Sequence, residues 1–262
     1  MRTARFTETY GPYALVVGGS YGLGAAFAEA LARRGLNLVL LARQEDRLAA
    51  TATRLQQTYG VDVVAFAADV AEYENVKERI SVLDVPIGLL VYDAAYAPIG
   101  RFEDVSEEQL ARATDVNVRA PLLLAKLLSA PMIERGRGGI VLMSSLAGSQ
   151  GSPNIATYAA TKSFNAVLAE GLWMELKPRG VDVLACMAGA ILTPGYREAE
   201  GARTAPGALE AAEVAERTLN ALGNGPIFVP GAVNKLARFT LMRMLSRRAA
   251  ITIMSKNTGG LS

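Results

Sequence analysis

Residues 13–24 read YALVVGGSYGLG, and this stretch decides the fold. Tyr13 to Val17 is an uninterrupted apolar run, typical of a strand that is buried on both faces. A turn of spacing G-x-x-x-G-x-G follows from Gly18 to Gly24, and a helical pattern then continues from Ala25 to Arg34. Glycines at such a junction allow a tight turn and the close approach of a pyrophosphate to the first N–H groups of the helix. The order of these elements therefore predicts a nucleotide site, although a glycine turn that binds nothing remains the alternative.

Apolar, β-favouring runs and helical patterns alternate along the rest of the chain. Strands are expected at 36–41, 61–65, 87–91, 140–144, 181–187 and 226–229, and helices at 45–59, 71–81, 106–135, 156–177 and 208–222. Strands separated by helices imply right-handed crossovers and a parallel sheet. We therefore predict a single-domain α/β fold over residues 1–262, a Rossmann-type doubly wound parallel β-sheet flanked by helices on both faces.

Composition excludes several classes of function. Hydrophobic residues make up 51% of the 262 residues and charged residues 20%, enough for a large core and unlike a disordered chain. A net charge of +2 gives no case for a nucleic-acid surface. The chain has no histidine, which removes the commonest metal ligand and general base, and no metal site is expected. The single cysteine, Cys186, lies in an apolar run and is expected to be buried.

The two ends of the chain bear on its location. The first 19 residues lack the apolar core of a secretory signal, and no apolar run approaches about 20 residues, so a cytoplasmic location is expected. The segment 231–256 is basic and amphipathic, and residues 231–262 contain no acidic residue. Such a segment more often packs on its own domain or on a partner subunit than on a membrane, and peripheral membrane contact is the less favoured alternative.

Ligands of a doubly wound sheet bind beyond the carboxyl ends of its strands. Arg43 follows the second strand, where a carboxylate would receive the ribose hydroxyls of NAD and an arginine accommodates a 2′-phosphate. The position favours NADP(H) over NAD(H), with Ser20 adding a hydroxyl, unless Arg43 is simply a solvated residue. Asp69, after the third strand, is placed to face an adenine amino group, to cap the next helix, or to do both. The Pro/Gly-bearing stretch 193–207 is interpreted as a long active-site loop.

A second group of polar residues surrounds the fifth strand. Tyr158 and Lys162 are four residues apart in an expected helix and so share one face. An ammonium beside a phenol favours the phenolate and lowers the pKa of the phenol. Ser145, at the end of the strand, would place a hydroxyl beside Tyr158. Alternatively, the pair is an exposed helix face on which the aromatic ring rests against a lysine stem.

Taken together, these motifs resemble those of the short-chain dehydrogenase/reductase family, from Tyr13 to the last strand. The resemblance is carried by the turn 17–24, Asp69-Val70, Asn117, Ser145, Tyr158, Lys162 and the segment 188–193. It implies an NAD(P)-dependent enzyme that interconverts a carbonyl compound and an alcohol. The implied cofactor contacts are Gly18, Ser20, Tyr21, Gly22, Leu23, Arg43, Asp69, Val70, Asp93, Tyr158, Lys162, Ile191 and Thr193.

The resemblance also implies roles for four catalytic residues. Tyr158 would be the acid or base, and Lys162 would hold the nicotinamide ribose and depress the pKa of Tyr158. Ser145 would bind the carbonyl oxygen, and Asn117 would anchor a water that returns the proton. The implied substrate is a small molecule, with a mild preference for a hydrophobic one because of Tyr96, Pro98, Leu146 and Tyr196. A homodimer or homotetramer is implied as well.

Two segments depart from the family pattern. Residues 92–95 read Tyr-Asp-Ala-Ala where the family has Asn-Asn-Ala-Gly, and Ala188 replaces a proline. Asp93 lacks the amide donor of an asparagine and introduces a charge that is costly to bury without partners. These departures leave a second hypothesis open, a catalytically weak or silent NADP-binding protein with a regulatory or scaffold role.

Overall fold

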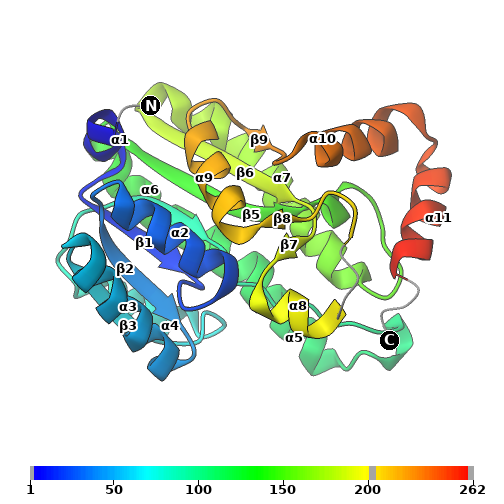
Figure 1. Cartoon of the computed structure of the whole chain (residues 1–262), viewed down its shortest axis with the longest axis horizontal. Coiled ribbons are helices and arrows are strands. Elements are labelled where there is room, and N and C mark those ends of the chain that lie inside the picture. Colours follow the sequence, from blue (N-terminus) through cyan, green and yellow to red (C-terminus); the bar gives the residue numbers. More distant parts are fainter. Residues whose placement is uncertain (1–2, 201–204, 259–262) are drawn as a thin grey trace.

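The computed structural model describes residues 3–200 and 205–258 and is built on one seven-stranded sheet (Figure 1). The strand order is β3-β2-β1-β4-β5-β6-β9, and each neighbouring pair is parallel. The strands are β1 (Tyr13–Val17), β2 (Asn37–Ala42), β3 (Val63–Ala67), β4 (Ile87–Tyr92), β5 (Gly138–Ser145), β6 (Val181–Ala188) and β9 (Ile227–Phe228). The predicted fold class is confirmed, and strand order reverses between β1 and β4, where this fold binds ligands.

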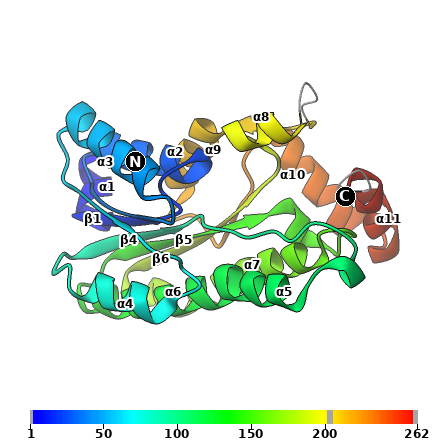
Figure 2. The same cartoon turned by 90° about the horizontal axis from the view of Figure 1, so that it is seen from below.

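Helices cover both faces of the sheet, as Figure 2 shows from the side. One face carries α2 (Gly22–Arg33), α3 (Glu45–Tyr59) and α9 (Ala211–Ala221), and the other carries α4 (Tyr73–Ser81), α5 (Glu107–Thr114), α6 (Ala120–Glu134) and α7 (Ala156–Leu176). Short helical turns are η1 (Phe102–Asp104), η2 (Asp115–Arg119), η3 (Leu146–Ser149) and η4 (Lys177–Arg179). Because helices cover both faces, the central strands are buried throughout, which explains their continuous apolar runs.

Some elements carry no clear signal in the sequence. The chain begins with α1 (Thr3–Tyr10), whose Phe6 and Tyr10 are buried in the core. The stretch 193–207, expected as a loop, contains α8 (Pro194–Glu200), so that expectation was wrong in part. Proline is favoured at the first position of a helix, where its missing N–H has no partner to lose. A small ladder of β7 (Ile191–Leu192) with β8 (Leu209–Glu210) encloses this segment, and residues 201–204 lie outside the described part.

The basic segment after residue 230 is helical, as its spacing predicted. It forms α10 (Ala232–Phe239), the π-helical turn η5 (Thr240–Met244) and α11 (Arg247–Thr258). In Figures 1 and 2 these elements stand out from one end of the sheet. By length and composition alone, the helical stretch Glu107–Glu134 would suffice to cross a membrane. It nevertheless packs on the sheet through buried leucines, as a core helix does.

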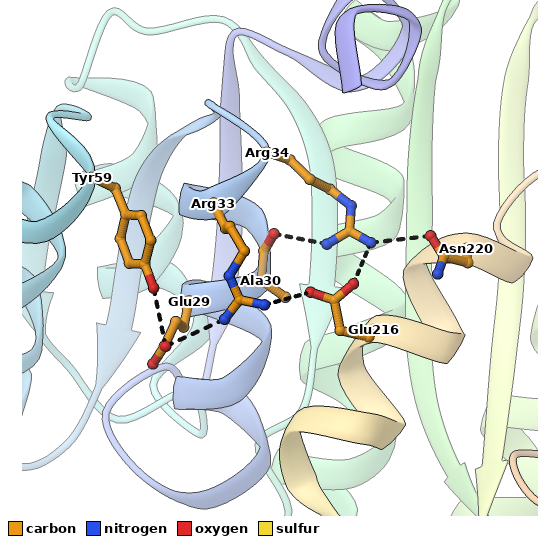
Figure 3. A network of polar contacts seen from close by, with 7 residues as sticks. All are labelled: Glu29, Ala30, Arg33, Arg34, Tyr59, Glu216 and Asn220. Atoms are coloured by element: carbon orange, nitrogen blue, oxygen red, sulfur yellow. Dashed lines mark hydrogen bonds and ion pairs between the residues drawn. The ribbon is translucent and has the colours of Figure 1, made fainter. Parts of the chain in front are cut away.

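A network of polar contacts connects helices α2, α3 and α9 on one face of the sheet (Figure 3). Arg34, at the end of α2, pairs with Glu216 of α9 at 2.6 Å and donates to Asn220 at 3.0 Å. Glu29 of α2 accepts a hydrogen bond from Tyr59 of α3 at 3.0 Å. Such partly exposed contacts contribute at most about 1 kcal/mol each, so they mainly fix the orientation of α2. The N-terminus of that helix faces the candidate site.

Candidate active site

The turn between β1 and α2 requires glycine at three positions. Gly18 has φ +92°, and a Cβ atom placed on it would lie 2.9 Å from the backbone nitrogen of Ala94. A Cβ atom on Gly24 would lie 2.1 Å from the carbonyl oxygen of Gly18. Gly22 has φ +56° and lies against the Thr193 side chain, 3.2 Å from an added Cβ. The backbone is therefore closely packed around the helix N-terminus, as a phosphate-binding turn requires.

A cavity of about 580 Å³ lies beside this turn, at the carboxyl ends of β1 to β4. Seven residues predicted to contact a cofactor line it: Gly18, Ser20, Tyr21, Arg43, Asp69, Val70 and Asp93. The remaining predicted contacts lie outside its wall. Leu23 is buried in the core, and Ile191 packs against the same core from β7. The structure therefore brings seven of the predicted contact residues together around one cavity.

The outer wall of the cavity is basic. Arg43 and Arg47 both line it and are exposed. The Arg47 guanidinium lies 4.8 Å from the centre of the Tyr21 ring, in cation–π geometry. Sequence reasoning missed Arg47, which lies in the first turn of α3, four residues after Arg43 at the end of β2. Two cations beside the second strand fit a ligand that carries phosphate there.

Asp69 does not cap α4, whose N-cap is Glu72, and its predicted contact with adenine stays a prediction. Its carboxylate accepts the Ala71 N–H at 3.0 Å, in the turn before α4, and it also lines the cavity. Arg112 of α5 pairs with it at 2.6 Å and stacks over the Tyr96 ring at 5.5 Å. Burial acts to raise the pKa of Asp69, but the Ala71 and Arg112 hydrogen bonds outweigh it and hold that pKa below its ordinary value. Arg112 gave no signal in the sequence because only the packing of α5 brings it here.

The proposed catalytic side chains converge at the end of β5. Ser145 ends the strand, and its hydroxyl is hydrogen-bonded to Tyr158 of α7. Burial raises the pKa of Tyr158, while the Ser145 hydrogen bond acts to lower it. Lys162 lies one turn further along α7, its Nζ 5.6 Å from the centre of the Tyr158 ring. The alternative of an exposed helix face is wrong for Lys162, which is 3% exposed.

The backbone of β5 holds the Lys162 ammonium. The Lys162 Nζ donates to the Met143 carbonyl oxygen at 2.9 Å. Burial lowers the pKa of Lys162 to about 8, against the opposing effect of Asp93. Desolvation is the largest influence on the Tyr158 pKa and raises it, so the lowering expected from Lys162 together with a bound cofactor stays a prediction. The structure thus brings Ser145, Tyr158 and Lys162 together, as the motif spacing predicted.

Asp93 occupies the junction between the cavity and the catalytic group. It is half-buried, and its carboxylate accepts the backbone N–H of Gly24 at the start of α2. Desolvation raises the pKa of Asp93 to about 6, although Lys162 and the Gly24 N–H act to lower it. The charge that replaces the family's asparagine therefore has two partners, a cation and a helix N-terminus, rather than none.

Tyr92 and Asn117 fix the loop that follows β4. The Tyr92 hydroxyl donates to the Val116 carbonyl oxygen, at the π-helical turn η2 that carries Asn117. Asn117 is fully buried, and its amide bonds the backbone of Tyr96 in both directions, at 2.7 and 2.8 Å. It also donates to Thr161, beside Lys162. The bulk of Tyr92 thus anchors the turn instead of obstructing it.

A family model described as short chain dehydrogenase matches residues 12–203. The chain belongs to this family. Within the family, the chain is 31% identical to the mouse "Inactive hydroxysteroid dehydrogenase-like protein 1" over 76% of its own length and 59% of that protein. It therefore spans little more than half the length of this curated relative.

Solved structures of family members cover the chain more fully. One, from work on 7beta-hydroxysteroid dehydrogenase stereoselectivity, superposes with a TM-score of 0.88 at 26% identity, covering 95% of this chain and 98% of that one. A short-chain dehydrogenase from Sphingobium yanoikuyae, in complex with NADPH, gives a TM-score of 0.79 at 32% identity, covering 92% and 95%. The family resemblance drawn from the motifs is thus confirmed.

Proposed function

We propose that this protein is an NADP(H)-dependent oxidoreductase that interconverts a carbonyl compound and an alcohol. One observation carries the proposal: the Ser145–Tyr158 hydrogen bond and the buried Lys162 lie beside a glycine-turn cavity with two arginines on its wall. Proton transfer and dinucleotide binding need these two features at neighbouring ends of the same strands.

The cavity fits a dinucleotide with a 2′-phosphate. Gly18 and Gly24 leave no room for a Cβ, and the first N–H groups of α2 face a pyrophosphate position. Arg43 and Arg47 would bind the 2′-phosphate, while Asp69 and Val70 would border the adenine. The Sphingobium relative holds NADPH, whereas a Brucella melitensis reductase, 28% identical, holds NAD, so the preference rests on the two arginines.

Each catalytic side chain has a defined task. A bound NADPH supplies the hydride that reduces the carbonyl carbon. Tyr158 donates its phenolic proton to the carbonyl oxygen, and Ser145 donates a hydrogen bond to that oxygen as negative charge develops. Lys162 orients the nicotinamide ribose and provides a buried positive charge beside the phenolate that forms. Asn117 holds the Tyr96 loop against α7 and so keeps the substrate side of the group in place.

The substrate side favours an apolar compound. Tyr96 and Leu146 are half-buried apolar side chains beside the loops that follow β4 and β5, and the Tyr196 hydroxyl accepts the Ala205 N–H in the segment after β7. A hydrophobic carbonyl compound or alcohol therefore fits this side best. We further propose a cytoplasmic homo-oligomer, on the basis of the sequence features and the family.

Two titrations test the proposal. NADPH and NADH are titrated into the protein, followed by the change in nicotinamide fluorescence, and NADPH consumption is then measured across a panel of apolar ketones and aldehydes. Tight binding of NADPH, weaker binding of NADH and turnover of an apolar ketone or aldehyde are expected. Failure to bind either dinucleotide would contradict the cofactor assignment. Binding of NADH at least as tight as that of NADPH would contradict the preference for NADP(H).

A silent NADP-binding role is the second candidate. It is favoured by the raised pKa of Tyr158, which opposes ionisation, and by the charge at Asp93. The mouse relative is named as inactive. NADPH binding with no consumption on the whole panel, between pH 6 and 10, would support this candidate against the enzyme.

A further inference from the structure

The segment 231–248, here called the basic arm, exposes an apolar stripe. Val233, Leu236 and Phe239 follow one another at three-residue spacing on α10, and Leu236 is 67% exposed and Phe239 56%. Met244, at the end of η5, is 69% exposed. Single exposed apolar residues are ordinary on a protein surface, but a contiguous stripe of them marks an interaction surface.

The basic arm carries only positive charge. Its Lys235, Arg238, Arg243, Arg247 and Arg248 are accompanied by no aspartate or glutamate between residues 231 and 262. Within the described ranges 3–200 and 205–258, none of these five side chains forms an ion pair. Arg247 donates to the Ser149 carbonyl oxygen at 3.0 Å, which fixes the base of the arm on η3. The partner of this surface must therefore be both apolar and acidic.

A surface of that chemistry exists on the same chain. The segment 98–108, here called the acidic shelf, exposes Ile99 (54%) and Phe102 (66%). Its exposed carboxylates are those of Glu103, Asp104, Glu107 and Glu108. Within the described part, three of them have no ion-pair partner, and Glu103 has only a 3.8 Å contact with exposed Arg101. A hollow of about 300 Å³ opens between Pro98, Phe102, Val105, Pro153 and Thr157.

We infer that the basic arm of one copy of this chain docks on the acidic shelf of a second copy. The two surfaces match in both apolar character and charge, and a two-fold axis lets each copy offer both. An arm-to-arm contact would instead bring like charges together. In both views the arm stands at the end of the molecule nearest α5, whose first turn belongs to the shelf (Figures 1 and 2). An anionic membrane at that end would repel the shelf carboxylates, so a lipid surface is the poorer occupant.

This contact would complete the walls of the candidate active site. The hollow in the shelf is formed by the loop after Tyr96 and by residues 153–157, which lead directly into Tyr158. The arm of the second copy would therefore cover the two loops on either side of the catalytic tyrosine. The pairing itself follows from the two surfaces and holds whether or not the proposed reaction is correct.

The mass of the full-length protein in solution tests the pairing. Analytical ultracentrifugation is run on the wild type and on Leu236→Glu/Phe239→Glu. The two buried carboxylates should raise the dissociation constant of the dimer at least about 100-fold. Val82→Glu, at an apolar position 79% exposed beyond α4, is the matched control and should leave the mass unchanged. A wild type that is monomeric throughout, or a dimer that survives the double change, would overturn the inference.

Charge-reversal variants distinguish a second copy of the chain from a lipid surface as the partner of the basic arm. Lys235→Glu/Arg243→Glu and Glu103→Lys/Glu107→Lys should each weaken the dimer, and the two sets combined should restore it. The same variants are sedimented with vesicles of phosphatidylglycerol and phosphatidylcholine. If the arm variants lose vesicle binding and keep the wild-type mass, the arm binds lipid and the inference is wrong.

Cross-linking identifies which surfaces meet. Cys186 is the only cysteine and is buried, so introduced cysteines report cleanly. A short bismaleimide should link Phe102→Cys to Met242→Cys when the two variants are mixed, and should link neither variant to itself. Self-linking of Met242→Cys alone would show an arm-to-arm contact and would contradict the proposed pairing.

Discussion

Charged side chains are buried at one end of the candidate site and exposed at the other. At the catalytic end, Lys162 is buried and hydrogen-bonded to backbone, and Asp93 faces a helix N-terminus. At the nucleotide end, Arg43 just after β2 and Arg47 in the first turn of α3 are exposed. Desolvation shifts pKa values at the first end, whereas salt screens the charges at the second. Substitutions at the catalytic end should therefore change proton transfer and stability, and those at the nucleotide end should change affinity.

The largest effect is expected from Tyr158→Phe. Removal of the phenolic proton should lower NADPH turnover about 10³-fold, since positioned acids typically contribute 10²–10⁴-fold. The dissociation constant of NADPH should change by less than about twofold, because the cavity wall does not include Tyr158. Stopped-flow turnover and fluorescence titration measure the two quantities. Tyr13→Phe, which removes a hydroxyl bonded to Asp62 on the sheet, is the matched control. Substantial residual turnover would exclude Tyr158 as the acid.

Asp93→Asn probes the buried charge directly. The pKa of Asp93 is raised from 3.8 to about 6, so between these values the folded chain binds more protons than the unfolded chain. Stability should therefore fall as the pH rises through this window and stay lower above it. The free energy of unfolding of Asp93→Asn should exceed that of the wild type by about 3 kcal/mol at pH 8, and the difference should nearly vanish at pH 4. Urea unfolding at both pH values measures this, with exposed Asp104→Asn as the control. A variant that is less stable at pH 8 would show that the ionised carboxylate stabilises the fold.

The difference between the two ends also explains what could be predicted from the sequence. The strands, the glycine turn and the Ser145, Tyr158 and Lys162 group follow from local patterns and family spacing. Helix α3 begins and ends where it was predicted, because Gly60 adopts the left-handed conformation that ends a helix. Segment 193–207 was misjudged in part, because a local start signal for α8 was overlooked: the Thr193 hydroxyl accepts the Tyr196 N–H at 3.1 Å, and Pro194 takes the first helical position.

Electrostatics at the site could not be predicted in the same way. The pKa of a group depends on how completely it is buried, and that is set by elements far apart in the sequence. The salt bridge of Arg112 with Asp69 joins α5 to the end of β3, and the Gly24 hydrogen bond of Asp93 joins β4 to α2. Neither pairing has a sequence spacing that identifies it.

Arg43→Ala tests the exposed end. Loss of one charged hydrogen-bond donor should raise the dissociation constant of NADPH about 10-fold, and that of NADH by less than about twofold. The ratio of the NADH and NADPH dissociation constants should shrink at high salt, because Arg43 is exposed and salt screens its attraction for the 2′-phosphate. Arg54→Ala is the matched control, since Arg54 lies on α3, outside the cavity wall, and pairs with Glu29 at 3.0 Å. An equal loss for both cofactors would show that Arg43 does not read the 2′-phosphate.

The smallest effect is expected from Arg47→Ala. The Arg47 guanidinium lies over the exposed Tyr21 ring, so its charge is already held in place, and an exposed cation–π contact stabilises by only about 0.5–1 kcal/mol. We expect NADPH to bind about threefold more weakly, and Tyr21→Leu to reproduce part of this loss because it frees the same guanidinium. Fluorescence titration of the two variants and their combination gives the coupling between the residues. A loss as large as that of Arg43→Ala would show instead that Arg47 is a main contact of the 2′-phosphate. The cavity would then bind that phosphate through the first turn of α3 as well as through the end of β2.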